Sequence, residues 1–197
     1  MKRAIFPGSF DPFTRGHLSI VMRALALFDH VIIAIGQNTD KTRMVAVEQR
    51  IKTLEQLFQN EEKISVTQYS GLTMDFCKTQ NAQFIIRGLR NAQDFNYEQS
   101  IAQNNLQLGA IETVFLSAEP HLSHLSSTIA RDIAKYGGDL KSFYLIRPNK
   151  ILTHKIQSNK KASMLRMKAS YILNTRPYYS AATCFVRLDF KFAALLA

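Results

Sequence analysis

Residues 2–17, KRAIFPGSFDPFTRGH, decide the fold that we predict, because they lead from a short apolar strand through a turn into a helix. Gly8 follows the strand, and a glycine at that point lets the backbone approach a ligand closely. Thr14 or Arg15 opens the helix, so the free N–H groups of its first turn, with the positive end of the helix dipole, form an anion site. We expect Gly16 to leave room for a phosphate group and His17 to project towards it.

The sequence up to residue 157 alternates short apolar runs with longer amphipathic ones. Strands are predicted at 2–6, 31–35, 64–69, 83–87 and 113–116, and helices at 17–28, 47–58, 72–80, 94–108 and 127–136. Strands separated by helices indicate βαβ crossovers, and therefore an α/β, Rossmann-like fold: a five-stranded parallel sheet with helices on both faces. Ligands bind such sheets beyond the carboxyl ends of the strands, which places the chemistry after residues 6, 35, 87 and 116.

The net charge of +10 belongs mostly to the C-terminal part of the chain. Residues 1–150 hold 17 Lys+Arg and 14 Asp+Glu, whereas the last 47 residues hold 8 basic residues and one acid, Asp189. From about residue 158 the alternation of strands and helices stops. We therefore predict one domain over residues 1–157 and a basic appendage over residues 158–197. The apolar content of the appendage favours peripheral packing over disorder, away from any active site.

Several classes of protein are excluded by composition. No run of about 18 apolar residues is present, so no membrane span is expected. The N-terminus lacks the apolar stretch of a signal peptide. Cys77 and Cys184 match no metal-ligand spacing. These features predict a cytoplasmic protein with free thiols, with no metal site made of its own residues.

Two further motifs follow predicted strands. Residues 125–131, LSSTIAR, open a helix, so their hydroxyl and N–H groups supply a second phosphate cradle. Arg87 and Arg90 flank Gly88 at the end of the fourth strand, where two guanidinium groups suit a triphosphate or a phosphorylated substrate. The sequence holds neither a Walker loop nor a G-x-G-x-x-G turn.

These motifs resemble those of a known superfamily. Residues 7–17 resemble the T/H-x-G-H signature of the nucleotidyltransferases, and residues 125–131 resemble their I-S-S-T-x-x-R signature. The string RGLR at 87–90 with DFNYE at 94–98 is similar to one branch, the phosphopantetheine adenylyltransferase family, as is Thr14 in place of the first histidine. The resemblance runs from residue 2 to about residue 140.

The resemblance implies roles for individual residues. The catalytic residues would be Ser9, His17, Lys41 and Arg90, and the pantetheine substrate would be bound by Ser9, Lys41, Thr73 and Arg87. ATP would be bound by Ser9, Phe10, Gly16, His17, Gly88, Leu89, Arg90, Glu98, Leu122, Ser123, His124, Leu125, Ser126, Ser127 and Thr128. Three of these positions depart from the pattern: Ser9 stands where Thr is commoner, Thr73 where an aliphatic residue or Met is frequent, and Leu125 where the signature has Ile.

The reaction implied by the resemblance is attack of the 4′-phosphate of phosphopantetheine on the α-phosphorus of ATP, which releases pyrophosphate. His17, Lys41, Arg87 and Arg90 are expected to act as cations that neutralise the developing charge. Mg²⁺ is expected to travel with the triphosphate. The family resemblance further suggests a homohexamer whose small-molecule partners are ATP and 4′-phosphopantetheine.

Other functions share parts of this pattern. A nicotinate or nicotinamide mononucleotide adenylyltransferase, or a glycerol-type cytidylyltransferase, would keep the fold and both phosphate motifs. Thr14 and the Arg87–Arg90 string argue against both. A nucleic-acid-binding protein would use the basic appendage, whose aromatic residues show no recognition-module pattern, so no nucleic-acid or membrane partner is expected. A third alternative is a structural or regulatory protein that keeps the fold but has lost catalysis. The intact motif residues argue against it, because such a protein would not need them.

Overall fold

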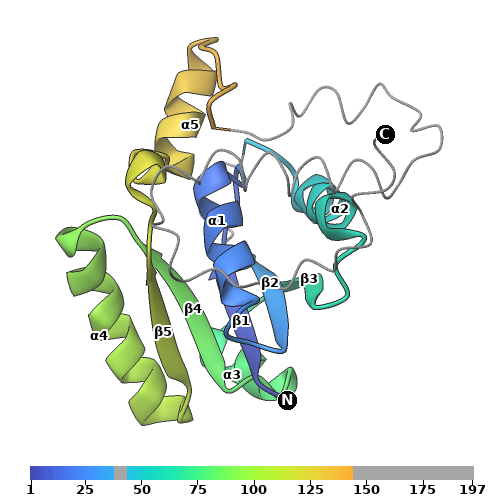
Figure 1. Cartoon of the computed structure of the whole chain (residues 1–197), viewed down its shortest axis with the longest axis vertical. Coiled ribbons are helices and arrows are strands. Elements are labelled where there is room, and N and C mark those ends of the chain that lie inside the picture. The colour runs from blue at the N-terminus through green and yellow to red at the C-terminus, as the bar shows by residue number, and fades with distance from the viewer. Residues whose placement is uncertain (38–43, 144–197) are drawn as a thin grey trace, which may run out of the picture. The chain divides into compact units, whose positions relative to one another are not determined.

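The computed structural model describes residues 1–37 and 44–143. In chain order the elements are β1 (Arg3–Gly8), α1 (Arg15–Ala24), β2 (His30–Gly36), α2 (Val47–Phe58), β3 (Ile64–Tyr69), α3 (Thr73–Thr79), β4 (Phe84–Leu89), α4 (Ala92–Gly109), β5 (Glu112–Ser117), the 3₁₀ turn η1 (Pro120–Leu122) and α5 (Ser127–Lys135). The five predicted strands and five predicted helices are all present, which confirms the predicted α/β fold class (Figure 1).

The five strands form one parallel sheet in the order β3-β2-β1-β4-β5. Side chains alternate across it, as the period of two in a strand requires. Phe6 and Ile33 point to the face covered by α1 and α2, where they pack with Val21 and Leu54. Ile5 and Ile32 point to the other face. The buried residues on both faces explain why the strands are so apolar.

Four strands end later than predicted, β1 and β4 by two residues and β2 and β5 by one. β1 continues through Pro7 and Gly8 instead of ending at residue 6, because it stays paired with β2 as far as Gly8 opposite Ile35. Its pairing with β4 stops at Ile5 opposite Ile85, so Pro7, which has no N–H to donate, lies beyond that ladder. β4 likewise continues to Leu89 through its pairing with β5. Beyond Ile5 and Ile85, β1 and β4 are no longer paired, and this opening is the start of the cleft described below.

The helix boundaries also differ in places from the prediction. Thr14 is the N-cap of α1, as predicted for the opening of this helix, but α1 ends at Ala24 and residues 25–27 form a turn. α4 runs from Ala92 to Gly109 and is longer than predicted at its start, because the Asn91 side chain caps it by accepting a hydrogen bond from the backbone N–H of Asp94. No helix within residues 1–37 and 44–143 is both long and apolar enough to cross a membrane. The predicted appendage, residues 158–197, lies outside the described residues.

Candidate active site

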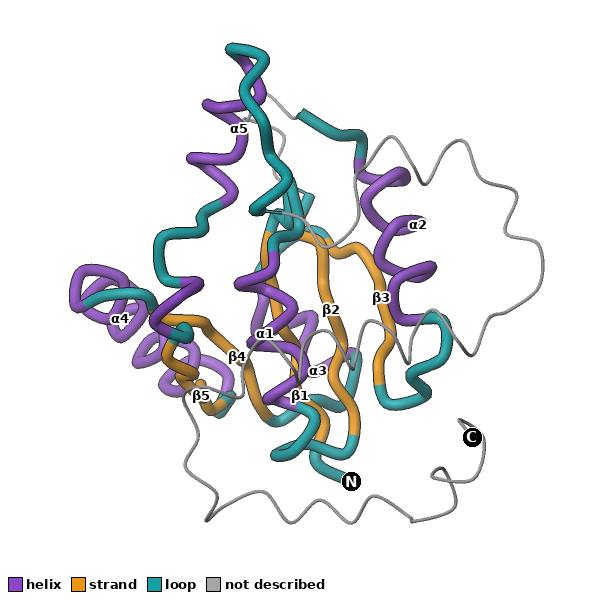
Figure 2. Tube along the Cα trace, turned by 45° about the horizontal axis from the view of Figure 1, so that its top comes forward, coloured by secondary structure: helices purple, strands orange, loops and turns teal. Residues whose placement is uncertain are grey.

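A cavity of about 740 Å³ opens at the carboxyl ends of β1 and β4. The strand order reverses between these two strands, and such a switch point is where parallel sheets bind their ligands. Most of the lining comes from the segments that follow β1, β4 and β5 and from the first turns of α1 and α5, which Figure 2 shows gathered at one end of the sheet. The end of β2, α2 and α4 also contribute. The place predicted for the chemistry therefore holds a cavity.

The segment after β1 is fixed by packing and by backbone contacts. Phe10 has a φ of 45°, which is strained for a phenylalanine, and its buried ring packs against Phe6 and Phe13. Gly8 accommodates this ring, because a Cβ there would lie 2.8 Å from Phe10 Cζ. The carboxylate of Asp11 accepts hydrogen bonds from the backbone N–H groups of residues 44 and 45, at 2.9 and 3.1 Å. Gly8 therefore serves the packing of the loop as well as any approach to a ligand.

The two signature motifs are hydrogen-bonded to each other. Ser127 donates its hydroxyl to the carbonyl oxygen of Pro12 at 2.8 Å, and Arg131 Nη1 donates to the carbonyl oxygen of Asp11 at 2.8 Å. Ser126 caps α5 by accepting from the N–H of residue 129 at 3.1 Å. The first turns of α1 and α5 thus lie at the same cavity, so their free N–H groups can bind an anion there.

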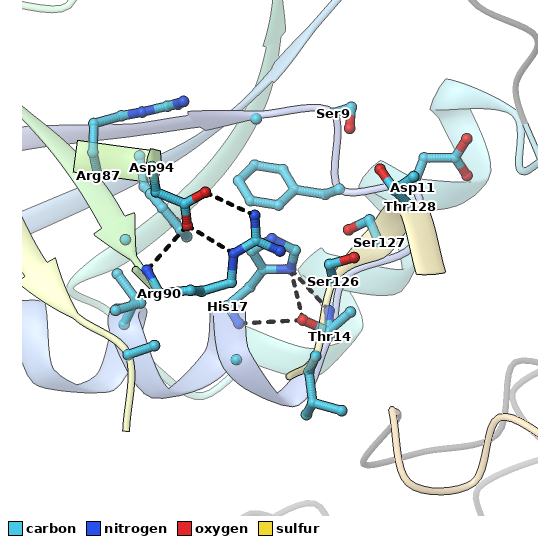
Figure 3. Close-up of a pocket in the computed structure, with 18 of the residues that line it drawn as sticks. Ser9, Asp11, Thr14, His17, Arg87, Arg90, Asp94, Ser126, Ser127 and Thr128 are labelled. Atoms are coloured by element: carbon cyan, nitrogen blue, oxygen red, sulfur yellow. Dashed lines mark hydrogen bonds and ion pairs between the residues drawn. The ribbon is translucent and has the colours of Figure 1, made fainter. Parts of the chain in front are cut away.

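His17 is held by the capping box of α1. Its Nδ1 accepts a hydrogen bond from the backbone N–H of Thr14 at 3.0 Å and lies 3.1 Å from the Thr14 hydroxyl (Figure 3). The rings of Phe6, Phe10 and Phe13 lie 5.2–6.2 Å from the imidazole, centre to centre. Burial, followed by the charges of nearby arginines, lowers the pKa of His17 to about 4.

In the free protein His17 is therefore neutral at pH 7, whereas the sequence led us to expect a cation at this position. Since Nδ1 accepts the Thr14 N–H, the single ring proton belongs on Nε2. A neutral imidazole in this tautomer offers one N–H donor. Its position in the cavity lining makes that donor available to a ligand oxygen.

The two arginines of the β4 end are each bound to a carboxylate of α4. Arg87 donates from Nε to Glu98 Oε2 at 2.7 Å and from Nη2 to Glu98 Oε1, while its Nη1 donates to the carbonyl oxygen of Pro7 at 2.9 Å. Arg90 donates from Nε and Nη2 to the two oxygens of Asp94, at 2.8 and 3.0 Å. Arg90 holds the pKa of Asp94 below its usual range. Glu98, implied by the resemblance to contact ATP, here contacts Arg87.

The cavity brings together most of the residues that the sequence singled out. Its lining includes Ser9, Phe10, Gly16, His17, Arg87, Gly88, Arg90, Glu98, Leu122, Leu125, Ser126, Ser127 and Thr128. Thr73, Leu89, Ser123 and His124 are not part of the lining. Thr73 begins α3 and its hydroxyl lies 2.8 Å from that of Tyr69, and the Ser123 hydroxyl donates to the carbonyl oxygen of Pro120 at 2.9 Å. Lys41 lies outside the described residues.

Four charged residues of the lining were not among the predicted site residues: Asp11, Arg50, Asp94 and Arg131. Arg131 closes the second signature and Asp94 lies four residues after Arg90, so a sequence signal existed for both. Arg50 donates to the carbonyl oxygen of Ser9. These residues are 41 positions apart, so no local sequence pattern could predict the contact. Among the described residues, no three His, Cys, Asp or Glu side chains are grouped to hold a metal ion.

Comparison with known proteins agrees with this geometry. Residues 5–133 match the family described as Cytidylyltransferase-like. The chain is 50% identical over 139 residues to a phosphopantetheine adenylyltransferase of Christiangramia forsetii, which covers 71% of this chain and 92% of the relative. It is 52% identical over 143 residues to a phosphopantetheine adenylyltransferase of Cytophaga hutchinsonii, which covers 72% of this chain and 95% of the relative.

A solved structure supports the fold alone. A bifunctional NMN adenylyltransferase/ADP ribose pyrophosphatase from Francisella tularensis superposes with a TM-score of 0.61 at 16% identity, over 88% of this chain and 54% of that protein.

The match to residues 5–133 covers the strands and helices that build the cavity, and two relatives share half of the aligned residues over nearly their whole length. The chain therefore belongs to the phosphopantetheine adenylyltransferase family of cytidylyltransferase-like nucleotidyltransferases.

Proposed function

We propose that this protein transfers the adenylyl group of ATP to 4′-phosphopantetheine, giving dephospho-coenzyme A and pyrophosphate. The observation that carries the proposal is the cavity at the β1–β4 switch point. There the neutral donor His17, the arginines Arg87 and Arg90 and two helix N-termini converge, in a chain half identical to phosphopantetheine adenylyltransferases.

The reaction needs alignment of two phosphate groups more than a protein nucleophile. An oxygen of the 4′-phosphate forms a bond to the α-phosphorus of ATP, while the bond from that phosphorus to the α–β bridging oxygen breaks and pyrophosphate leaves. No proton has to move for the atoms to balance. The task of the protein is to hold the attacking and leaving oxygens in line and to stabilise charge on the oxygens between them.

We assign the stabilising contact to His17. Its Nε2–H donor is fixed on one side by the hydrogen bond of Nδ1 to Thr14 and on the others by aromatic rings, so it does not need to reorganise during the reaction. Its low pKa leaves it uncharged in the free protein, where it offers this N–H as a hydrogen-bond donor. This donor would act on an oxygen of the α-phosphate, where negative charge gathers in the transition state.

The other roles follow the layout of the cavity. Arg87, next to Pro7 of β1, would hold the phosphate of the acceptor, and Arg90 would face the triphosphate. The first turn of α5, capped by Ser126, would bind the distal phosphates of ATP through N–H groups, with Ser127 and Thr128 beside them. Ser9 would orient the acceptor phosphate from the β1 segment. The phosphate-binding role of Lys41 and the substrate contact of Thr73 stay predictions from the resemblance.

We propose that Mg²⁺ enters with ATP as part of the substrate. The carboxylates in the described part of the cavity lining are Asp11, Asp94 and Glu98. Each is already engaged, Asp11 with two backbone N–H groups and the other two with arginines. This donor set favours a hydrated Mg²⁺ held by phosphates over one bound by protein oxygens.

The experiment that tests the function is release of pyrophosphate from MgATP with 4′-phosphopantetheine as acceptor. Parallel reactions replace the acceptor with nicotinamide mononucleotide, nicotinate mononucleotide or glycerol 3-phosphate, and replace ATP with CTP. We expect turnover only with ATP and phosphopantetheine. Turnover only with one of the other acceptors or with CTP would show that the family membership is right and the substrate assignment wrong.

We also propose that the enzyme is a homo-oligomer, a hexamer by family resemblance, that works in the cytoplasm, where its substrate ATP is available. α4 supports self-association, because only Glu98 among its 18 residues is buried. Tyr97, Ile101, Leu106 and Leu108 are exposed, Tyr97 to 68% and Leu108 to 64%. Light scattering after size exclusion should give the mass of an oligomer, and Ile101→Glu with Leu108→Glu should reduce it. A monomeric wild type would disprove this assembly.

A further inference from the structure

Asp94 lies in the cavity without a role in the reaction proposed above. Its carboxylate accepts three hydrogen bonds, all from one residue. Oδ2 accepts from the backbone N–H of Arg90 at 3.0 Å and from Nε at 2.8 Å, and Oδ1 accepts from Nη2 at 3.0 Å. Asp94 therefore fixes both the backbone and the guanidinium of Arg90, as the dashed lines in Figure 3 show.

Asp94 is itself rigidly placed. It lies in the first turn of α4, where its backbone N–H donates to the N-cap side chain of Asn91 at 2.8 Å. A carboxylate is favoured at that end of a helix by the helix dipole. Arg90 also holds the pKa of Asp94 below its usual range, so the carboxylate is charged at neutral pH. The arginine is thus bound to a fixed point on a long helix.

The geometry leaves part of Arg90 for a ligand. The fork occupies Nε–H and one N–H of Nη2, which leaves the second N–H of Nη2 and both N–H groups of Nη1. Figure 3 shows the guanidinium extending from Asp94 towards the His17 ring, and the charge of Arg90 contributes to the low pKa of His17. A donor that is already in place stabilises a transition state more than one that must first find its position.

We propose that Asp94 is a positioning residue for the adenylyl transfer, which acts by holding Arg90 against the phosphates. This inference rests on the proposed function. Glu98, one helical turn after Asp94, binds Arg87 in a similar fork, so α4 orients both arginines from one face. Asp94 itself touches no substrate in this scheme.

A positioning role and a purely electrostatic role predict opposite results for Asp94→Asn. The variant removes a negative charge from a site that binds anions, so electrostatics alone would tighten binding of ATP and leave kcat equal or higher. Loss of positioning instead lowers kcat. We expect a fall of about 10- to 100-fold in kcat, with the KM for ATP unchanged or lower.

The test is a double-mutant cycle in the pyrophosphate-release assay on the full chain, with wild type, Asp94→Asn, Arg90→Ala and the double variant. If Asp94 acts through Arg90, the double variant has the kcat of Arg90→Ala within about threefold. Asp94→Glu keeps the charge but has a longer side chain, so it should recover only part of the kcat that Asp94→Asn loses. Asp75→Asn is the matched control, since Asp75 is also an acid in the first turn of a helix, but is exposed and outside the cavity.

Three outcomes would overturn the inference: an unchanged or raised kcat in Asp94→Asn, a raised KM for MgATP alone, or losses that multiply in the double variant. The last two would mean that Asp94 meets the substrate or its Mg²⁺ directly. Melting temperatures of all variants separate misfolding from loss of positioning. The acceptor that the wild type uses separates the substrate assignment from the positioning role of Asp94. A wild type that turns over only with another acceptor disproves the substrate assignment. The double-mutant cycle is then measured with that acceptor and still tests Asp94.

Discussion

The two sides of the cavity are built by different means. On the β1 side, residues 9–17 are held by carbonyl, hydroxyl and ring contacts, and their principal donor, His17, is uncharged. On the β4 side, Arg87 and Arg90 are charged, and each is bound to a carboxylate of α4. The described lining holds four arginines and three carboxylates, a near balance within a chain of net charge +10. Phosphate recognition therefore depends on oriented donors more than on an excess of positive charge.

Replacing His17 tests the uncharged side and should have the largest effect. We expect His17→Ala to lower kcat by about 10²–10³-fold with a small change in the KM for ATP, because the Nε2–H contact acts mainly in the transition state. The variant also loses the capping interaction with Thr14, so its melting temperature should be measured. An unchanged kcat with a raised KM would mean that His17 only binds the ground state.

Replacing Glu98 tests the charged side. In Glu98→Gln, Arg87 loses its carboxylate, and we expect the KM for phosphopantetheine to rise about tenfold with little change in the KM for ATP. The free energy of unfolding should fall by about 1–3 kcal/mol, below the range for a fully buried pair, since the Arg87 side chain is 30% exposed. Urea unfolding and substrate titrations measure both. A raised KM for ATP alone would favour the direct ATP contact implied by the family resemblance.

The charge state of His17 connects the two sides and can be measured in the free enzyme. NMR titration, with His17→Gln to identify the signal, should show that His17 titrates near pH 4. Because its pKa in the unfolded chain is near 6.5, the unfolded state binds the extra proton between pH 4 and 6.5. The contribution of His17 to stability is therefore complete above pH 6.5 and is lost as the pH falls towards 4. Arg90→Ala should raise the pKa of His17 only part of the way towards 6.5, because burial is a larger cause of the low pKa than the charge of Arg90. A midpoint near 6.5 in the wild type would contradict the neutral donor.

The order of strands and helices could be predicted because each element carries its own periodicity, and the first-turn motifs could be placed because they follow strands. The end of β1 could not be predicted, since Pro7 and Gly8 read locally as a turn and become strand only through pairing with β2. The neutrality of His17 likewise depends on Phe6 and Phe10 and on Arg87 and Arg90 at the end of β4, a set that meets only in the folded chain. The pairing of Arg90 with Asp94 was not predicted either, although their spacing of four residues is a signal for it. Asp94 was predicted as the start of a helix, and its contact with Arg90 depends on an N-cap three residues earlier.

The smallest effect is expected from deletion of residues 158–197. The cavity lining described here comes from residues 6–131, and curated relatives are covered to 92–95% by 139–143 residues of this chain, which leaves more than a quarter of it unmatched. We therefore expect the truncated protein to keep kcat within about a factor of three, with any change confined to solubility, assembly or melting temperature. Pyrophosphate release and light scattering on both proteins provide the comparison. If the truncated protein kept its fold and oligomeric state but lost more than tenfold in kcat, residues 158–197 would belong to the active site. The cavity would then have a third side besides the β1 side and the β4 side.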